Sequence, residues 1–308
     1  MSAGHPTLDF IPCSAVYNIA SSWHGFSAIK HLVVFGASYC DVGYRSPVRT
    51  PSHPTPKEPL GVEFPGETYA EPGRPNWVGY LVTKYAGHHE MVAYCYAVGG
   101  AGVDDVEHQV KNYFEPDIGQ KPEWARWDAT DTLFVTWIGI NDCAWGCDIS
   151  SKMETLKGAH KRLFDAGARN FLFINLPPIE RSPGMLNGVH SSKPKNKPSH
   201  AISLLVASSR LNAGQIYKDW NKALAETVRQ FANANHSEIT AMIFSSYDTF
   251  TNVLDDPISC GFTFDDVRKE GGGIWYDNLH PTSRMHDMIA ADMAQFLGDQ
   301  FEFGFVED

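Results

Sequence analysis

Four separate stretches of the chain hold residue types that together could carry out acyl transfer. Ser38 follows an apolar run, where a tight turn can expose its hydroxyl as a nucleophile. Asp277 lies three residues before His280, a spacing that lets the carboxylate accept the Nδ1 proton and leaves Nε2 free as a general base. Gly100, in a glycine-rich turn, and Asn141, after another apolar run, could donate hydrogen bonds to a developing oxyanion. The four stretches therefore predict a nucleophile, a base with its orienting acid, and an oxyanion hole.

Each of these residues also has an ordinary explanation. Ser38 and Asn141 could be turn residues, Gly100 could belong to a flexible turn, and His280 could be a surface histidine near a helix start. The pair Asp105–His108 repeats the same Asp-x-x-His spacing. We reject it as the base, because it falls where the first turn of a helix is expected and an exposed helical pair explains it. The combination and order of the four stretches, more than any single residue, favour catalysis.

The strands that must position these residues are visible as five short apolar runs. Each run is continuous rather than alternating, which is typical of strands buried on both faces of a parallel sheet. The runs are His31–Phe35, Met91–Ala97, Thr132–Ile138, Phe171–Asn175 and Ala241–Ser245. Ser38, Gly100 and Asn141 each follow one of the first three runs. Because reactive groups in open α/β sheets gather at the carboxyl ends of the strands, we expect these residues to lie along one edge.

Helical patterns fill the intervals between the runs. Asn76 can cap a helix, and apolar periodicity predicts a long helix over Leu204–Ala232 and a last helix over Ser283–Leu297. Strand and helix alternate from end to end, which predicts a single α/β domain spanning residues 1–308.

Three segments break this alternation. Residues 1–28 form an N-terminal extension. The proline-rich stretch Pro47–Pro75 is either a lid or an inert insertion, and the polar stretch Gly184–His200 is expected to be a solvated loop.

The composition excludes several function classes. The chain has 308 residues, is 43% apolar, and carries 25 basic against 36 acidic residues, a net charge of −11. A folded core is therefore expected, and nucleic acid is a poor candidate partner. No apolar run approaches the ~20 residues of a membrane span. No secretory signal is visible, so a native start at Met1 favours the cytoplasm, whereas a start added to a mature chain leaves secretion open.

The six cysteines are too sparse for a disulfide scaffold. Cys143 and Cys147 could pair, although free buried thiols are the expectation.

The order of the four stretches resembles the four sequence blocks of the SGNH (GDSL-type) hydrolases, over nearly the whole chain. The matching blocks are Gly36-x-Ser38, Gly100, Gly139-x-Asn141-Asp142 and Asp277-x-x-His280. Three further stretches resemble the fungal acetylesterases of carbohydrate esterase family 16. They are Asn175–Pro183, Pro257–Phe264 and Leu279–Thr282.

The resemblance implies a flavodoxin-like three-layer α/β/α sandwich with about five parallel strands. It also implies serine ester hydrolysis without metal or organic cofactor, often the removal of acetyl groups from sugars and xylo-oligosaccharides. Ser38 would be the nucleophile, His280 the base and Asp277 its orienting acid. The backbone N–H groups of Ser38 and Gly100 and the amide of Asn141 would form the oxyanion hole.

One position departs from the family pattern. The block reads Gly-Asp-Ser, and this chain has Ala37 in the middle. That aspartate is not the acid of the triad, but its carboxylate could hold the nucleophile loop. Ala37 therefore raises the alternative of a carbohydrate-binding pseudoenzyme, while a lipase or thioesterase acting on longer acyl chains is the alternative within enzymes.

The substrate side of the site is less defined by the sequence. Tyr39, Trp145 and Trp275 could form an apolar or sugar-stacking wall, although core packing is the commoner role of such residues. We expect a small-molecule or oligosaccharide ester as substrate. The oligomeric state stays open.

Overall fold

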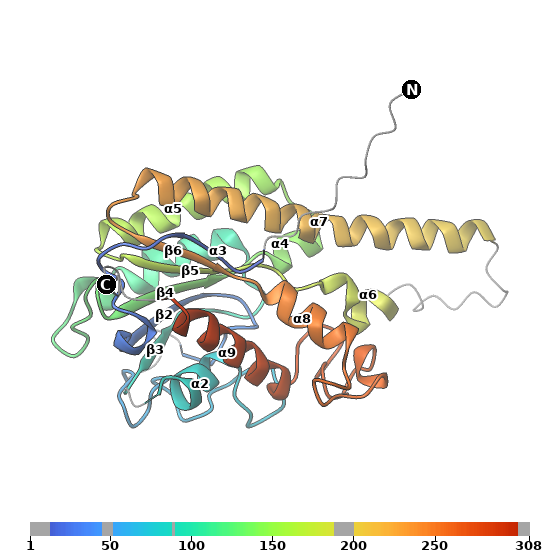
Figure 1. Ribbon diagram of the computed structural model, residues 1–308, viewed down its shortest axis with the longest axis horizontal. Coiled ribbons are helices and arrows are strands. Elements are labelled where there is room, and N and C mark those ends of the chain that lie inside the picture. Colours follow the sequence, from blue (N-terminus) through green and yellow to red (C-terminus); the bar gives the residue numbers. More distant parts are fainter. Residues whose placement is uncertain (1–12, 45–51, 88–89, 188–199, 301–308) are drawn as a thin grey trace, which may run out of the picture.

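The computed structural model describes residues 13–44, 52–87, 90–187 and 200–300. Its centre is a six-stranded sheet with the strand order β1-β6-β5-β4-β2-β3 (Figure 1). The strands are β1 (Ala15–Asn18), β2 (His31–Gly36), β3 (Val92–Cys95), β4 (Thr132–Trp137), β5 (Asn170–Ile174) and β6 (Thr240–Phe244). All neighbouring pairs from β2 to β6 are parallel. The predicted α/β sandwich with five parallel strands is confirmed, and each of the five apolar runs contains or overlaps one of them.

The sixth strand, β1, lies in the N-terminal extension and was not among the predicted strands. It pairs antiparallel with β6 at the edge of the sheet, with Ala15 opposite Ile243 and Val16 opposite Met242. Its residues are partly buried, exposed, partly buried and buried in turn, instead of forming a continuous apolar run. The pattern that identifies strands buried on both faces therefore misses it.

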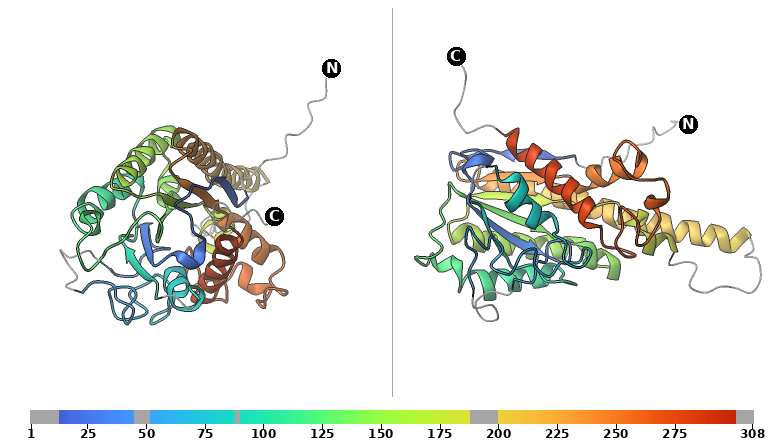
Figure 2. Two further views of the ribbon diagram at one scale, coloured as in Figure 1. Left: turned by 60° about the vertical axis from the view of Figure 1, so that its left-hand side comes forward. Right: turned by 90° about the horizontal axis from the view of Figure 1, so that it is seen from below.

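Helices cover both faces of the sheet and make three layers (Figures 1 and 2). One face carries α3 (Val103–His108), α5 (Ile149–Asp165) and α7 (His200–Ala234), and the other carries α2 (Trp77–Tyr80) and α9 (Ser283–Gly298). The shorter helices are α4 (Ile140–Trp145), α6 (Pro183–Asn187) and α8 (Ser246–Asp255). None of the helices within the described ranges is both long and apolar enough to cross a membrane.

Side-chain caps begin the helices that flank the site. Asn76 accepts hydrogen bonds from the backbone N–H of Val78 and Gly79, so the predicted cap is confirmed. The helix continues after α2 as a wider π-helical turn over Leu81–Tyr85. Thr282 Oγ1 accepts from the backbone N–H of Met285 and begins α9.

The proline-rich stretch is a loop as expected, whereas the polar stretch is partly helical. Residues 52–75 of the proline-rich stretch contain neither helix nor strand, apart from an isolated bridge between Thr55 and Glu58, and residues 47–51 lie outside the described residues. The N–H of Ala93 donates to the carbonyl of Pro59 at 2.7 Å, so this loop covers part of the edge strand β3. The polar stretch is helical at both ends, in α6 and from His200 in α7, and residues 188–199 lie outside the described residues.

All six cysteines are free thiols, so Cys143 and Cys147 are not linked. Cys143, Cys40 and Cys95 are buried as expected, whereas Cys13 is exposed.

Candidate active site

The carboxyl edge of the sheet brings Ser38, His280 and Asp277 into one hydrogen-bonded row. Ser38 lies on the turn after β2, and the other two residues lie on the loop before α9. His280 Nε2 is 2.9 Å from Ser38 Oγ, and His280 Nδ1 is 2.8 Å from Asp277 Oδ2. In this arrangement the imidazole can accept the serine proton while the carboxylate orients the ring.

A tight turn holds the acid and the base together. Asp277 Oδ1 accepts the backbone N–H of Leu279 at 2.7 Å and that of His280 at 2.6 Å. Partial burial raises the pKa of Asp277, but these two backbone hydrogen bonds and the one to the imidazole outweigh it and bring the pKa below its ordinary value. The Asp277 carboxylate is therefore ionised at any pH near neutrality.

The turn that carries Ser38 is clamped from two sides. The Gln109 side chain receives the N–H of Gly36 at 3.0 Å and donates to its carbonyl at 2.9 Å. Asp41, which is buried, accepts the backbone N–H of Gly99 at 2.9 Å. These hydrogen bonds hold the turn without a carboxylate at position 37.

The Asn141 side chain links the two loops that could supply oxyanion donors, its own loop and the loop of Gly100, through a hydrogen bond. Its Nδ2 donates one hydrogen bond to the carbonyl of Ala101 at 2.9 Å, next to Gly100. An amide nitrogen carries two hydrogens, so a second N–H is left for a ligand. Gly100 has φ +82°, a conformation that favours glycine. Asp142 accepts the N–H of Val103 at 3.2 Å and so supports the loop that follows Gly100.

A small cavity of about 10 Å³ lies beside Ser38 and Asn141. Its other lining residues are Ala37, Tyr39, Trp137, Ile138, Gly139 and Ile140. A space of this size holds about one water-sized group. It therefore suits a methyl group better than a longer alkyl chain.

The three predicted substrate-wall residues have different surroundings. Trp275 is fully buried, and its indole N–H donates to the carbonyl of Val267, so the prediction that it stacks on a sugar is wrong. Tyr39 is also buried and donates from its hydroxyl to the carbonyl of Leu279 at 2.7 Å. It therefore lines the small cavity and supports the histidine turn instead of forming an outer wall. Trp145 is 88% exposed at the end of α4, where a substrate could reach it.

The rejected pair Asp105–His108 does not form an acid–base unit. Asp105 accepts the N–H of Gly102 at 2.8 Å at the start of α3, and His108 Nδ1 is 2.7 Å from Asn112 Nδ2. Both are exposed surface interactions.

Tyr69 lies at the site and was not singled out from the sequence. Its ring centre is 4.9 Å from that of His280, and a methyl group at Gly99 would overlap its hydroxyl. The loop that carries it is tied to α9, because Glu71 accepts the N–H of Ser283 at 2.7 Å. The sequence showed only that Tyr69 belongs to the proline-rich stretch. It did not indicate which side chain of that stretch contacts His280.

Across the described residues there is no group of three or more His, Cys, Asp or Glu side chains that could hold a metal ion. The side chains around Ser38 are instead arranged for proton transfer and for hydrogen bonding to a carbonyl oxygen.

An α/β/α sandwich with a Ser–His–Asp row at the carboxyl edge is the arrangement of serine esterases and acyl hydrolases. The pattern of the GDSL-like lipase/acylhydrolase family matches residues 32–293. The chain therefore belongs to this family, and it is an ester hydrolase.

Two relatives are similar to the chain in sequence, and one solved structure is similar in fold. The chain is 30% identical to an acetylesterase of Thermothelomyces thermophilus over 86% of this chain and 87% of that protein. It is 22% identical to a phosphatidylcholine-sterol acyltransferase of Aeromonas hydrophila over 90% of this chain and 92% of that protein. The fold is similar to that of a GDSL-like lipase from Parabacteroides merdae, with a TM-score of 0.52 and 11% identity over 88% of this chain and 96% of that one.

Proposed function

We propose that the protein is an acetylesterase that removes acetyl groups from acetylated sugars or xylo-oligosaccharides through an acyl-enzyme on Ser38. The observation that carries this proposal is the cavity of about 10 Å³ between Ser38 and Asn141. The acyl carbon must sit at the Ser38 hydroxyl with its oxygen toward the donors, so the acyl chain is left with this methyl-sized space. The acetylesterase relative supports the same acyl group.

In the proposed reaction, Ser38 Oγ attacks the acetyl carbonyl carbon as His280 Nε2 takes the serine proton. The N–H groups of Ser38 and Gly100 and the amide of Asn141 stabilise the tetrahedral oxyanion. The C–O bond to the sugar then breaks, and His280 delivers its proton to the leaving sugar oxygen. In the second half, His280 takes a proton from water, the resulting nucleophile attacks the acetyl–Ser38 ester, and acetate leaves as the proton returns to Ser38.

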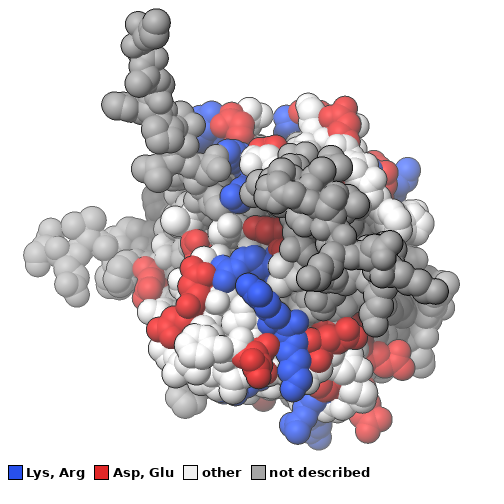
Figure 3. Space-filling view, turned by 90° about the vertical axis from the view of Figure 1, so that its right-hand side faces the viewer, with Lys and Arg blue, Asp and Glu red and all other residues white. Residues whose placement is uncertain are grey.

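The exposed rim favours a polar, uncharged leaving group. The described part of this side of the molecule carries basic side chains flanked by acidic ones instead of a field of one sign (Figure 3). Tyr69, which is 40% exposed beside His280, and the exposed Trp145 offer ring faces on which a sugar can lie.

Acyl-chain length tests the proposal directly. We expect release of acetate from acetylated xylo-oligosaccharides, and a kcat/KM for 4-nitrophenyl esters that falls about tenfold or more from acetyl to butyryl, because added methylenes have no space. Ile138→Ala should enlarge the cavity and raise the butyryl-to-acetyl ratio by about tenfold. The matched control is Ile289→Ala, which empties a similar volume in α9 and should leave the ratio unchanged.

Two results would point to the alternatives. Faster turnover of long-chain esters than of acetate esters would indicate a lipase or thioesterase. Sugar binding without any ester turnover, with turnover appearing in Ala37→Asp, would indicate a carbohydrate-binding pseudoenzyme.

The decrease in kcat/KM for ester hydrolysis at low pH is expected to depend on the protonation of a single group. Only a neutral imidazole at position 280 can accept the serine proton, so the rate falls as the pH is lowered. Asp277 stays ionised, because its pKa lies below the ordinary 3.8. The neighbouring His286 stays neutral, because burial, and then the charge of His280, lower its pKa to about 3. A plot of log kcat/KM against pH should therefore have an acid limb of slope one, and a slope of two would contradict this assignment.

A further inference from the structure

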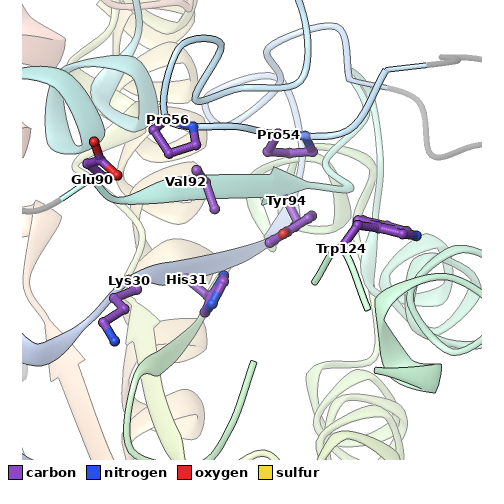
Figure 4. A pocket seen from close by; sticks show the side chains of 8 residues that line it. All are labelled: Lys30, His31, Pro54, Pro56, Glu90, Val92, Tyr94 and Trp124. Carbon is purple, nitrogen blue, oxygen red and sulfur yellow. The ribbon is translucent and has the colours of Figure 1, made fainter. Parts of the chain in front are cut away.

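A second hollow lies at the opposite end of the strands from Ser38 (Figure 4). It is lined by His31 at the start of β2 and by Val92 and Tyr94 of β3, whereas Ser38 follows the far end of β2. The length of β2 therefore puts the hollow roughly 17 Å from the turn that carries Ser38. The volume of the hollow is about 360 Å³, which is in the size range of small-molecule sites and far larger than the cavity beside Ser38.

One end of the hollow is aromatic. The ring centres of Tyr94 and Trp124 are 6.4 Å apart and their planes meet at 46°. The Trp124 ring stacks on His53 with a centroid distance of 3.5 Å, which holds its orientation while 42% of the residue remains exposed. Pro54 of the proline-rich loop adds apolar surface at this end, and Pro56 lies farther along the hollow toward Glu90 (Figure 4). This end therefore presents ordered apolar surface to a ligand.

The other end of the hollow is polar and carries no net charge. Lys30 and Glu90, both exposed, lie on opposite sides of this end, away from Trp124 (Figure 4). Burial lowers the pKa of His31 despite the opposing effect of Asp131, so its ring is neutral near pH 7. One positive and one negative group at this end offer hydrogen-bond donors and acceptors, while their opposite charges give little net attraction for an ion.

We infer that this hollow binds a neutral sugar, as a second carbohydrate site separate from the catalytic one. A pyranose has an apolar C–H face that suits Trp124 and a rim of hydroxyls that suits the lysine and the carboxylate. The choice of a xylo-oligosaccharide as ligand rests on the proposed function, in which the unreacted sugar units of the same substrate would occupy the hollow. The binding itself requires no ester and no chemistry at Ser38.

Calorimetric titration with unsubstituted xylohexaose tests the inference on the full-length protein. Trp124→Ala should weaken binding at this site by about tenfold or more, and Trp124→Phe should retain part of the affinity. Glu90→Ala should also weaken it. Hydrolysis of 4-nitrophenyl acetate should be unchanged in all three variants, since none of these residues lies near Ser38.

Trp145→Ala is the comparison variant, because it removes an exposed tryptophan at the catalytic end, where the proposed function places a different part of the sugar. It should leave the binding that depends on Trp124 intact. In heteronuclear NMR spectra, the indole N–H signal that is missing from Trp124→Ala should shift when xylohexaose is added, including when Ser38 is replaced by alanine.

The inference is overturned if Trp124→Ala leaves all xylohexaose binding unchanged, or if the Trp124 indole signal does not move at saturating sugar. If the unsubstituted protein hydrolyses no ester, the proposed function is contradicted. The sugar-binding result does not depend on that outcome.

Discussion

Alanine at position 280 is expected to lower kcat/KM for 4-nitrophenyl acetate by about 10⁴-fold or more. His280 is the group within hydrogen-bonding distance of Ser38 Oγ that can take its proton, at 2.9 Å, and it also returns that proton to the leaving oxygen. Without it, Ser38 remains a neutral alcohol and loses its nucleophilicity. The residual rate would come from the oxyanion donors and substrate binding alone. Initial rates over a range of ester concentrations measure the effect.

His108→Ala supplies the matched control, since His108 has the same Asp-x-x-His spacing but lies exposed on α3 beside Asn112. We expect its kcat/KM to stay within about twofold of the unsubstituted protein. Ser38→Ala should lose as much activity as His280→Ala, and the double variant should lose little more, because the two groups act as a unit. Equal losses in His108→Ala and His280→Ala would reject the assignment of the base.

Alanine at position 141 is expected to lower kcat by about 10²- to 10³-fold with a small change in KM. The Asn141 amide is anchored to the carbonyl of Ala101, and the residue lines the cavity beside Ser38, so its remaining N–H is left for a ligand. That hydrogen bond strengthens as the ester oxygen gains negative charge, so it stabilises the transition state more than the bound ester. Steady-state kinetics with acetate esters separate the two effects.

The anchoring bond means that Asn141→Ala could also loosen the Gly100 loop, and two measurements distinguish the effects. Asp142→Asn keeps the amide donor of Asn141 while weakening the support that Asp142 gives to Val103, so it should cost less activity than Asn141→Ala. Asn112→Ala removes an exposed asparagine and should be nearly silent. A rise in KM at constant kcat in Asn141→Ala would contradict a role in stabilising the oxyanion.

The five parallel strands were predictable because strands buried on both faces leave continuous apolar runs such as Thr132–Ile138. Strand β1 was not, because its edge position leaves one face open and removes the need for such a run. The Asn76 cap was predictable because capping depends on residues within one turn. The ends of α7 were not, because the length of a helix beyond its apolar stripe depends on what it packs against.

For the site, the sequence by itself determined which groups could react, because the Asp277–His280 spacing is local and each candidate donor follows a strand end. Only the tertiary structure decided how those groups are supported and what fits between them. Trp275 proved to be core, Tyr69 reached His280 from a loop without regular structure, and Gln109 and Asp41 took over the clamping of the nucleophile turn. The physical reason is that burial, close ring contacts and the size of a cavity arise from chain segments far apart in sequence, whose meeting no local spacing encodes.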